Sequence, residues 1–129
     1  MARFEKFEDI EAWQKARKLT KEVYLSSKVG GFYKDFALRD QVRSASVSIM
    51  SNIAEGFERG GNKEFIQFLS NAKGSCGEVR SQLYVALDQE YISQERFDDL
   101  SSRVIEVSRM VSGLMTYLPK IRVARQQVF

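Results

Sequence analysis

Apolar residues recur every three or four positions along four stretches of the chain, the spacing that places side chains on one face of an α-helix. The last stretch shows the pattern most clearly, with apolar positions at Phe97, Leu100, Val104, Val107, Val111, Leu114 and Leu118. The first three carry Ala12, Ala16, Leu19 and Val23; Leu38, Val42, Ala45, Ile49 and Ile53; and Phe65, Leu69, Ala72, Cys76, Val79, Leu83 and Leu87. No stretch alternates strictly between apolar and polar residues, as a half-buried strand would. The pattern predicts an all-α protein.

Few residues interrupt these stretches. The interruptions are Gly30-Gly31, Gly60-Gly61, the turn at 91–93 and Pro119. Glycine and proline in such positions mark helix ends, and acidic residues or Ser93 stand where the first, third and fourth helices would begin. The predicted helices span about residues 8–28, 37–59, 63–90 and 94–118, and residues 29–36 are expected to form a longer loop.

The pairing of the helices can be tested by register, because facing residues of an antiparallel pair have position numbers with a constant total. For the last two helices this rule joins apolar residues layer by layer, for example Phe65 with Leu118 and Cys76 with Val107. The middle pair and the first pair pass the same test. With short connections after the second and third helices, the sequence predicts one domain over 1–129, an antiparallel up-down-up-down four-helix bundle with a basic tail at 119–129.

A second set of aromatic residues lies outside the four core stripes. Its members are Phe7, Trp13, Tyr24, Phe32, Tyr33, Phe36, Phe57, Tyr84, Tyr91 and Tyr117. Some of these rings could cover the bundle ends and the 29–36 loop. Alternatively they form a subunit interface, because monomers seldom leave large apolar patches in water. Trp13 and Tyr24 flank one side of the first core stripe, so we expect them at an interface edge.

Polar residues next to the core suggest a structural network. Asn52 and Glu55 are one helical turn apart, and Glu55 can reach Arg59 four positions later. The register rule also places Arg43 opposite Glu78. The alternative is that Glu55 and Glu78 form a carboxylate pair for acid–base chemistry or metal binding. Cations nearby and the lack of histidine weigh against that alternative, so we expect a structural role.

The composition argues against an enzyme. There is no histidine, which removes the commonest general acid–base and the usual nitrogen ligand of zinc or iron. The single cysteine, Cys76, is in the core register and is expected to be a packing residue rather than a nucleophile. We therefore expect no catalytic activity, no cofactor and no metal.

The sequence also bears on location. No stretch approaches the roughly 20 uncharged apolar residues of a membrane span, and the first residues, MARFEKFEDIEAW, carry acids where a signal peptide would be apolar. One cysteine cannot form an internal disulfide, which agrees with a reducing compartment. We expect a cytoplasmic protein with no membrane partner.

The basic residues are unevenly distributed, although the formal net charge is only +3. Arg17, Lys18, Lys21 and Lys28 lie on the side of the first helix away from its core stripe. The C-terminal tail is free of acids and contains Lys120, Arg122 and Arg125. These seven residues are candidate phosphate contacts, and an oligomer would repeat each patch. Ordinary solvated helix faces would show the same pattern, so the residues alone leave both interpretations open.

Several segments resemble a known family. They are WQKARKLTKEVY, LRDQVRSASVSIMSNIAEGFERGGNKEFIQFLSNAKGSCGEV and the Tyr91-Ile92 ending. They are similar to the four-helix-bundle proteins encoded by intervening sequences in 23S ribosomal RNA genes, over roughly residues 8–118. The resemblance implies a homopentameric ring, related to the accessory protein of diversity-generating retroelements, which binds nucleic acid and a reverse transcriptase. It implies no known catalytic activity.

Two functions remain as predictions. The first is a homo-oligomeric adaptor that binds RNA or DNA through repeated basic patches without reading sequence. The second is a protein-interaction scaffold that does not bind nucleic acid, suggested by the aromatic residues outside the core stripes. An enzyme built on Glu55 and Glu78 is the weakest alternative.

Overall fold

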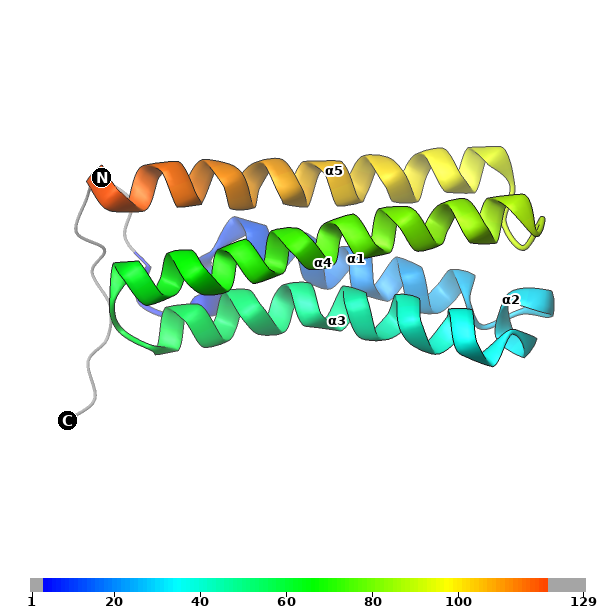
Figure 1. The fold of residues 1–129 in the computed structure, drawn as a ribbon, viewed down its shortest axis with the longest axis horizontal. Helices are drawn as coiled ribbons and strands as arrows, with labels where there is room; N and C mark the ends of the chain where they lie inside the picture. Colours follow the sequence, from blue (N-terminus) through cyan, green and yellow to red (C-terminus); the bar gives the residue numbers. More distant parts are fainter. Residues whose placement is uncertain (1–3, 121–129) are drawn as a thin grey trace.

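The computed structural model describes residues 4–120, and within them four long helices form an antiparallel bundle (Figure 1). They are α1 (Glu11–Ser26), α3 (Phe36–Glu58), α4 (Asn62–Asp88) and α5 (Gln94–Tyr117). Helix α1 packs against α3 and α5, and α4 packs against the same two helices. α1 and α4 therefore lie diagonally across the bundle. The predicted all-α, up-down-up-down bundle is confirmed.

The core consists of the four predicted stripes. Every predicted stripe residue is buried except Leu87 and Leu114, which are partly buried against the core. Residues outside the predicted stripes complete the interior at the two ends of the bundle. They are Ile10, Phe32, Phe57, Ala86 and Ile92. Within residues 4–120, no helix is both apolar enough and long enough to span a membrane.

The start of the first helix differs from the prediction. A short 3-10 helix, η1 (Phe7–Asp9), precedes α1, and Ile10 is extended with φ −78° and ψ 118°. The first α-helix therefore begins at Glu11 and not at residue 8. Ile10 is buried, so the extended residue turns its side chain into the core while the acidic turn stays outside.

The predicted 29–36 loop was wrong in part, because it contains a short helix, α2 (Gly30–Lys34). Gly30 has φ +58°, a left-handed conformation that glycine adopts without steric cost, and this allows the sharp turn out of α1. Phe32 from α2 is buried and stacks on Tyr91, with ring centroids 5.7 Å apart. The Tyr91 hydroxyl donates to Asp35 Oδ2 at 3.0 Å. α2 thus closes the end of the bundle where α4 turns into α5.

Side-chain caps stabilise the first turns of α5 and α3. The Ser93 side chain accepts a hydrogen bond from the Arg96 backbone N–H at 3.0 Å, as its position before α5 predicted. Asp35 plays the same role for α3, accepting from the Leu38 N–H at 3.2 Å. At the other end of the bundle, η2 (Leu118–Lys120) follows α5.

Candidate nucleic-acid interface

The outer side of α1 carries a surface hollow lined by cations. Its volume is about 400 Å³, and it is lined by Trp13, Gln14, Arg17, Lys18 and Lys21. The three basic side chains are exposed, whereas the core stripe of the same helix is buried. No acidic residue is among the lining residues. The structure therefore brings together three of the seven predicted phosphate contacts.

The ion pairs of α1 lie on its other flank, toward α5. Lys15 Nζ is 3.5 Å from Glu106 Oε1. Glu22 Oε1 is 3.4 Å from Arg96 Nη1 and 4.0 Å from Arg103 Nη2. Because Glu22 is engaged by α5, its carboxylate does not neutralise the outer side of α1.

The cations of the hollow stay unneutralised. Within residues 4–120, no ion pair involves Arg17, Lys18 or Lys21. A cluster of like charges without a carboxylate is an attractive surface for a polyanion, since only counterions screen it in the free protein.

Trp13 forms one wall of the hollow and is held in place from behind. It is partly buried against the core, and its ring meets Phe7 edge-to-face, with centroids 5.1 Å apart and planes at 67°. The Arg17 Cζ lies 5.9 Å from the ring centroid, near the outer limit of a cation–π contact. Gln14 donates through Nε2 to the Glu8 carbonyl at 2.8 Å, which orients its amide. The hollow thus has a supported aromatic wall and exposed cationic sides.

The remaining predicted phosphate contacts are separate from the hollow. Lys28 is exposed in the turn between α1 and α2. Lys120 is the last residue of η2, and Arg122 and Arg125 lie outside the described residues. Gln14 was not predicted as a site residue, although its spacing of three and seven residues from Arg17 and Lys21 places it on their side of the helix.

Arg43 does not face Glu78, so that part of the predicted network was wrong. Its Nε donates to Ser27 Oγ at 2.8 Å and its Nη2 to the Ser27 carbonyl at 3.1 Å. The guanidinium also lies over the Tyr24 ring, 4.6 Å from its centroid. Arg43 therefore leaves α3 toward α1, where a cation is favoured beside the C-terminal carbonyls of a helix.

Of the other members of the predicted network, only Glu55 and Arg59 contact each other among the described residues. Glu55 and Arg59 form the expected ion pair at 3.3 Å, and both side chains are about half exposed. Asn52 donates to the Ser48 carbonyl at 2.8 Å. Glu78 is exposed and borders a different polar hollow on α3 and α4. The residues support local packing and do not converge on a site.

Among the residues that the structure describes there is neither a metal-binding cluster nor an accessible thiol. Within residues 4–120, no group of three or more Cys, Asp or Glu side chains is arranged to hold a metal ion. Cys76 is buried between helices, and its burial raises the pKa of the thiol from 9.0 to about 11. A neutral, inaccessible thiol is a packing group and a poor nucleophile.

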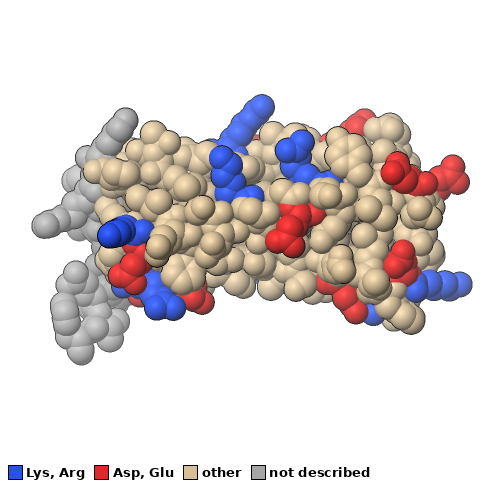
Figure 2. Space-filling view, in the orientation of Figure 1, with Lys and Arg blue, Asp and Glu red and all other residues tan. Residues whose placement is uncertain are grey.

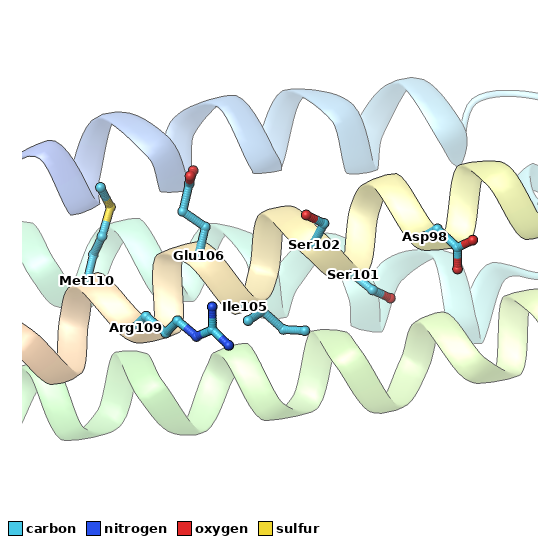
Figure 3. A pocket seen from close by; sticks show the side chains of 7 residues that line it. All are labelled: Asp98, Ser101, Ser102, Ile105, Glu106, Arg109 and Met110. Carbon is cyan, nitrogen blue, oxygen red and sulfur yellow. The ribbon is translucent and has the colours of Figure 1, made fainter.

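A larger hollow on α5 has a different electrostatic character. Its volume is about 580 Å³, and Figure 3 shows its lining residues, with Glu106 and Met110 pointing toward α1 and Ile105 and Arg109 toward α4. The lining includes two acids, Asp98 and Glu106, and one base. This mixed surface is less suited to a polyanion than the hollow on α1.

The face drawn in Figure 2 likewise shows no continuous basic patch. Its Lys and Arg side chains are scattered among uncharged and acidic residues, and acidic side chains gather at the end where α4 turns into α5. On the criterion of charge, the outer side of α1 is the better candidate interface.

The aromatic residues outside the core stripes differ in how far the fold buries them. Phe32 and Phe57 are buried, and Phe7, Trp13 and Tyr91 are partly buried against the core. The exposed ones are Tyr33, Phe36 and Tyr84.

Tyr33 and Phe36 lie at the α2 end of the bundle with Val29, and these three residues are called the end patch below. Their exposed fractions are 47%, 61% and 65%. Arg39 lies over both rings, 4.9 Å from the centroid of Tyr33 and 4.8 Å from that of Phe36. The end patch is apolar surface that the fold itself does not bury.

Comparison with known proteins supports the fold and identifies related sequences. A family model described as "23S rRNA-intervening sequence protein" matches residues 8–113. Among solved structures, one match is a protein of unknown function from the S23 ribosomal protein family of Bacteroides thetaiotaomicron. It is 21% identical, the match covers 81% of this chain and 95% of that chain, and the TM-score is 0.74. No curated protein matches the sequence. At this identity the structural likeness concerns the fold alone.

Proposed function

The chain belongs to the family of 23S rRNA-intervening sequence proteins, and from that premise we propose that it is a non-enzymatic, homo-oligomeric adaptor that binds RNA or DNA through the outer side of α1. One observation carries this proposal. Arg17, Lys18 and Lys21 line a single hollow that contains no acidic residue, and no ion pair within residues 4–120 involves them.

The proposed interaction is electrostatic. Lysine and arginine side chains replace the counterions condensed on the phosphates, and the release of those ions drives binding. The contacts fix the strand without reading base edges, so we expect little sequence preference. An oligomer would present several copies of the hollow, and binding at one would raise the effective concentration of phosphate at the next.

The proposal is tested by comparing two triple variants with the same charge change. The first replaces the cations of the hollow: Arg17→Gln, Lys18→Gln and Lys21→Gln. The matched control replaces three exposed cations of α4 that form no ion pair within residues 4–120: Lys63→Gln, Lys73→Gln and Arg80→Gln. Both variants bring the formal net charge from +3 to zero. Fluorescence anisotropy of labelled RNA and DNA would be measured at several salt concentrations.

We expect the wild type to bind with an affinity that falls steeply as salt increases. The α1 variant should bind much more weakly, and the slope of log affinity against log salt should fall in magnitude by about 2 to 3. The α4 variant should retain most of the affinity. Equal losses in both variants would mean that only net charge matters, and absence of binding by the wild type at low salt would overturn the proposal.

A second candidate function, a protein-interaction scaffold that does not bind nucleic acid, is favoured by the end patch. Exposed apolar side chains on one end of a bundle are typical of surfaces that contact other proteins. The same titration separates the two functions. If the wild type binds neither RNA nor DNA at low salt, whereas a Tyr33→Ser/Phe36→Ser variant loses a protein contact, the scaffold is the better description.

A further inference from the structure

We infer that the hollow on α1 is a site for an unpaired nucleobase, which stacks on Trp13 while Arg17, Lys18 and Lys21 hold the phosphates on either side of it. The protein would then prefer single strands to duplexes of the same length. This inference rests on the proposed function and specifies its ligand class. It follows from the aromatic wall of the hollow, a feature that phosphate binding alone does not use.

Trp13 has the properties of a stacking platform. Its ring is supported from behind by Phe7 and the core, so a base would meet a surface that is already positioned and would lose little entropy in ordering it. Arg17 lies 5.9 Å from the ring centroid. A contact this loose is easily displaced, and the displaced guanidinium would remain close enough to reach a phosphate.

Gln14 adds a polar group at the edge of the same hollow. Its Nε2 is held by the Glu8 carbonyl at 2.8 Å. Its Oε1 accepts no hydrogen bond from the described residues 4–120, so an acceptor of fixed direction is available to an N–H group of a base. An amide beside an aromatic wall can contact the edge of a base as the ring contacts its face.

The size and position of the hollow also select against a duplex. A volume of about 400 Å³ lies at the lower end of the range for small-molecule sites, roughly 300–1,000 Å³. In a duplex the bases are stacked inside the helix, and only phosphates and groove edges face the protein. Reaching Trp13 would require flipping a base out of the stack, which costs a few kcal/mol. A single strand avoids that cost.

A two-fold contact between copies, centred on the hollow, is less favourable than a bound nucleotide. In a two-fold interface centred here, Arg17, Lys18 and Lys21 of one subunit would face the same three cations of the other. Like charges brought together at an interface cost several kcal/mol. The hollow is therefore better matched to an anion than to its own copy.

The experiment uses the full chain and two probes of equal length, a labelled 12-nucleotide oligo(U) and a 12-base-pair RNA duplex. Trp13 is the only tryptophan, so stacking can be followed directly by intrinsic fluorescence, while probe anisotropy reports binding of either kind. We expect the single strand to quench Trp13 emission and the duplex to leave it nearly unchanged.

Two substitutions extend the test. Trp13→Leu should weaken binding of the single strand by roughly 5- to 100-fold, which is the range of base–aromatic stacking, and should change duplex binding little. Trp13→Phe keeps an aromatic wall and should restore most of the affinity. Circular dichroism and thermal unfolding would check that both variants fold, and the wild-type fluorescence titration does not depend on either of them.

The failures of the two proposals can be told apart. If the single strand binds by anisotropy but Trp13 emission is unchanged and Trp13→Leu binds equally well, the base site is wrong and the phosphate-binding surface stands. Equal quenching by single strand and duplex would also overturn the base site. So would a shift of Trp13 emission with protein concentration alone, because it would mean that a second copy covers the hollow. Absence of binding to both probes would overturn the proposed function as well.

Discussion

Arg43 ties the middle of α3 to the end of α1. It bonds both the hydroxyl and the carbonyl of Ser27, and Ser27 Oγ in turn donates to the Val23 carbonyl at 2.8 Å. Ser27 is fully buried. Because the Arg43 guanidinium is partly buried, losing its Ser27 partner would leave part of its desolvation cost uncompensated, and the Ser27 hydroxyl should therefore contribute to stability.

We predict that Ser27→Ala lowers the free energy of unfolding by about 1.5–3 kcal/mol, the range for hydrogen bonds to charged groups. Chemical denaturation would measure it. A double-mutant cycle of Ser27→Ala with Arg43→Met should give a coupling of at least about 0.5 kcal/mol. The same cycle with Glu78→Gln in place of Ser27→Ala should give none, and a large Arg43–Glu78 coupling would contradict the structure.

The error about Arg43 has a simple physical origin. The register rule predicts which residues of two antiparallel helices lie at the same height along the bundle. It does not predict toward which neighbouring helix a side chain beside the core turns. Arg43 is level with Glu78 and turns toward α1. The predictions for the core residues did not have this ambiguity, because a buried apolar side chain can point only inward.

At the scale of the elements, the approach of α3 to α4 depends on Gly56. A Cβ added at this position would lie 2.6 Å from Phe68 Cβ and 3.1 Å from Phe65 Cδ1. Phe68 Cβ is bonded to the backbone and cannot move without shifting α4, and Phe65 Cδ1 belongs to a fully buried ring. A glycine in the middle of a helix costs some stability, and here it allows the two axes to come close.

We expect Gly56→Ala to destabilise the bundle by about 1–3 kcal/mol through overpacking. Gly77→Ala makes the same chemical change in the middle of α4, where an added Cβ meets nothing within 4 Å. That variant should gain about 0.5–1 kcal/mol from helix propensity. Thermal unfolding of the two would show opposite shifts, and similar shifts of one sign would contradict this account.

The helices that could be predicted from the sequence are those in which the apolar pattern repeats over many turns. Four helices of many turns repeat their pattern often enough to be recognised, and their stripes are the core. α2 has only five residues, which is too short for a period, and its two glycines resemble a break between helices. Its contact with Tyr91, which is distant in sequence, could not be predicted from a local pattern: Phe32 stacks on that ring, and Asp35, the residue after α2, accepts a hydrogen bond from its hydroxyl.

On the scale of the whole molecule, the charged and apolar surfaces are in different places. The cationic hollow is on the outer side of α1, whereas the end patch of Val29, Tyr33 and Phe36 lies at the α2 end of the bundle. Nucleic-acid binding and self-association therefore need not compete for the same residues. This differs from the expectation that Trp13 and Tyr24 mark the subunit interface, which stays untested.

We predict that the protein has a native mass above that of one chain and that Tyr33→Ser/Phe36→Ser lowers it. Both side chains are largely exposed, so the variant should keep its fold while losing apolar area at a contact between copies. Sedimentation velocity at several concentrations would measure the mass, and the α4 triple variant is the control. A monomeric wild type would remove the oligomer from the proposed function.

The candidate site was predicted in part. The helical period was enough to place Arg17, Lys18 and Lys21 on the outer side of the first helix. It could not show that Trp13 and Gln14 form a hollow with them, because this depends on the Phe7 ring and on η1, a segment expected to be part of the helix. Neither could it show which acids of α1 are already paired.

The ion pairs of Glu22 with Arg96 and Arg103 depend on the folded bundle. In an isolated α1 segment Glu22 would be four residues from Lys18 and could pair with it across one turn. In the folded chain α5 holds that carboxylate on the opposite flank. Tertiary folding therefore increases the attraction of this surface for polyanions, and a peptide copied from α1 alone would underestimate it.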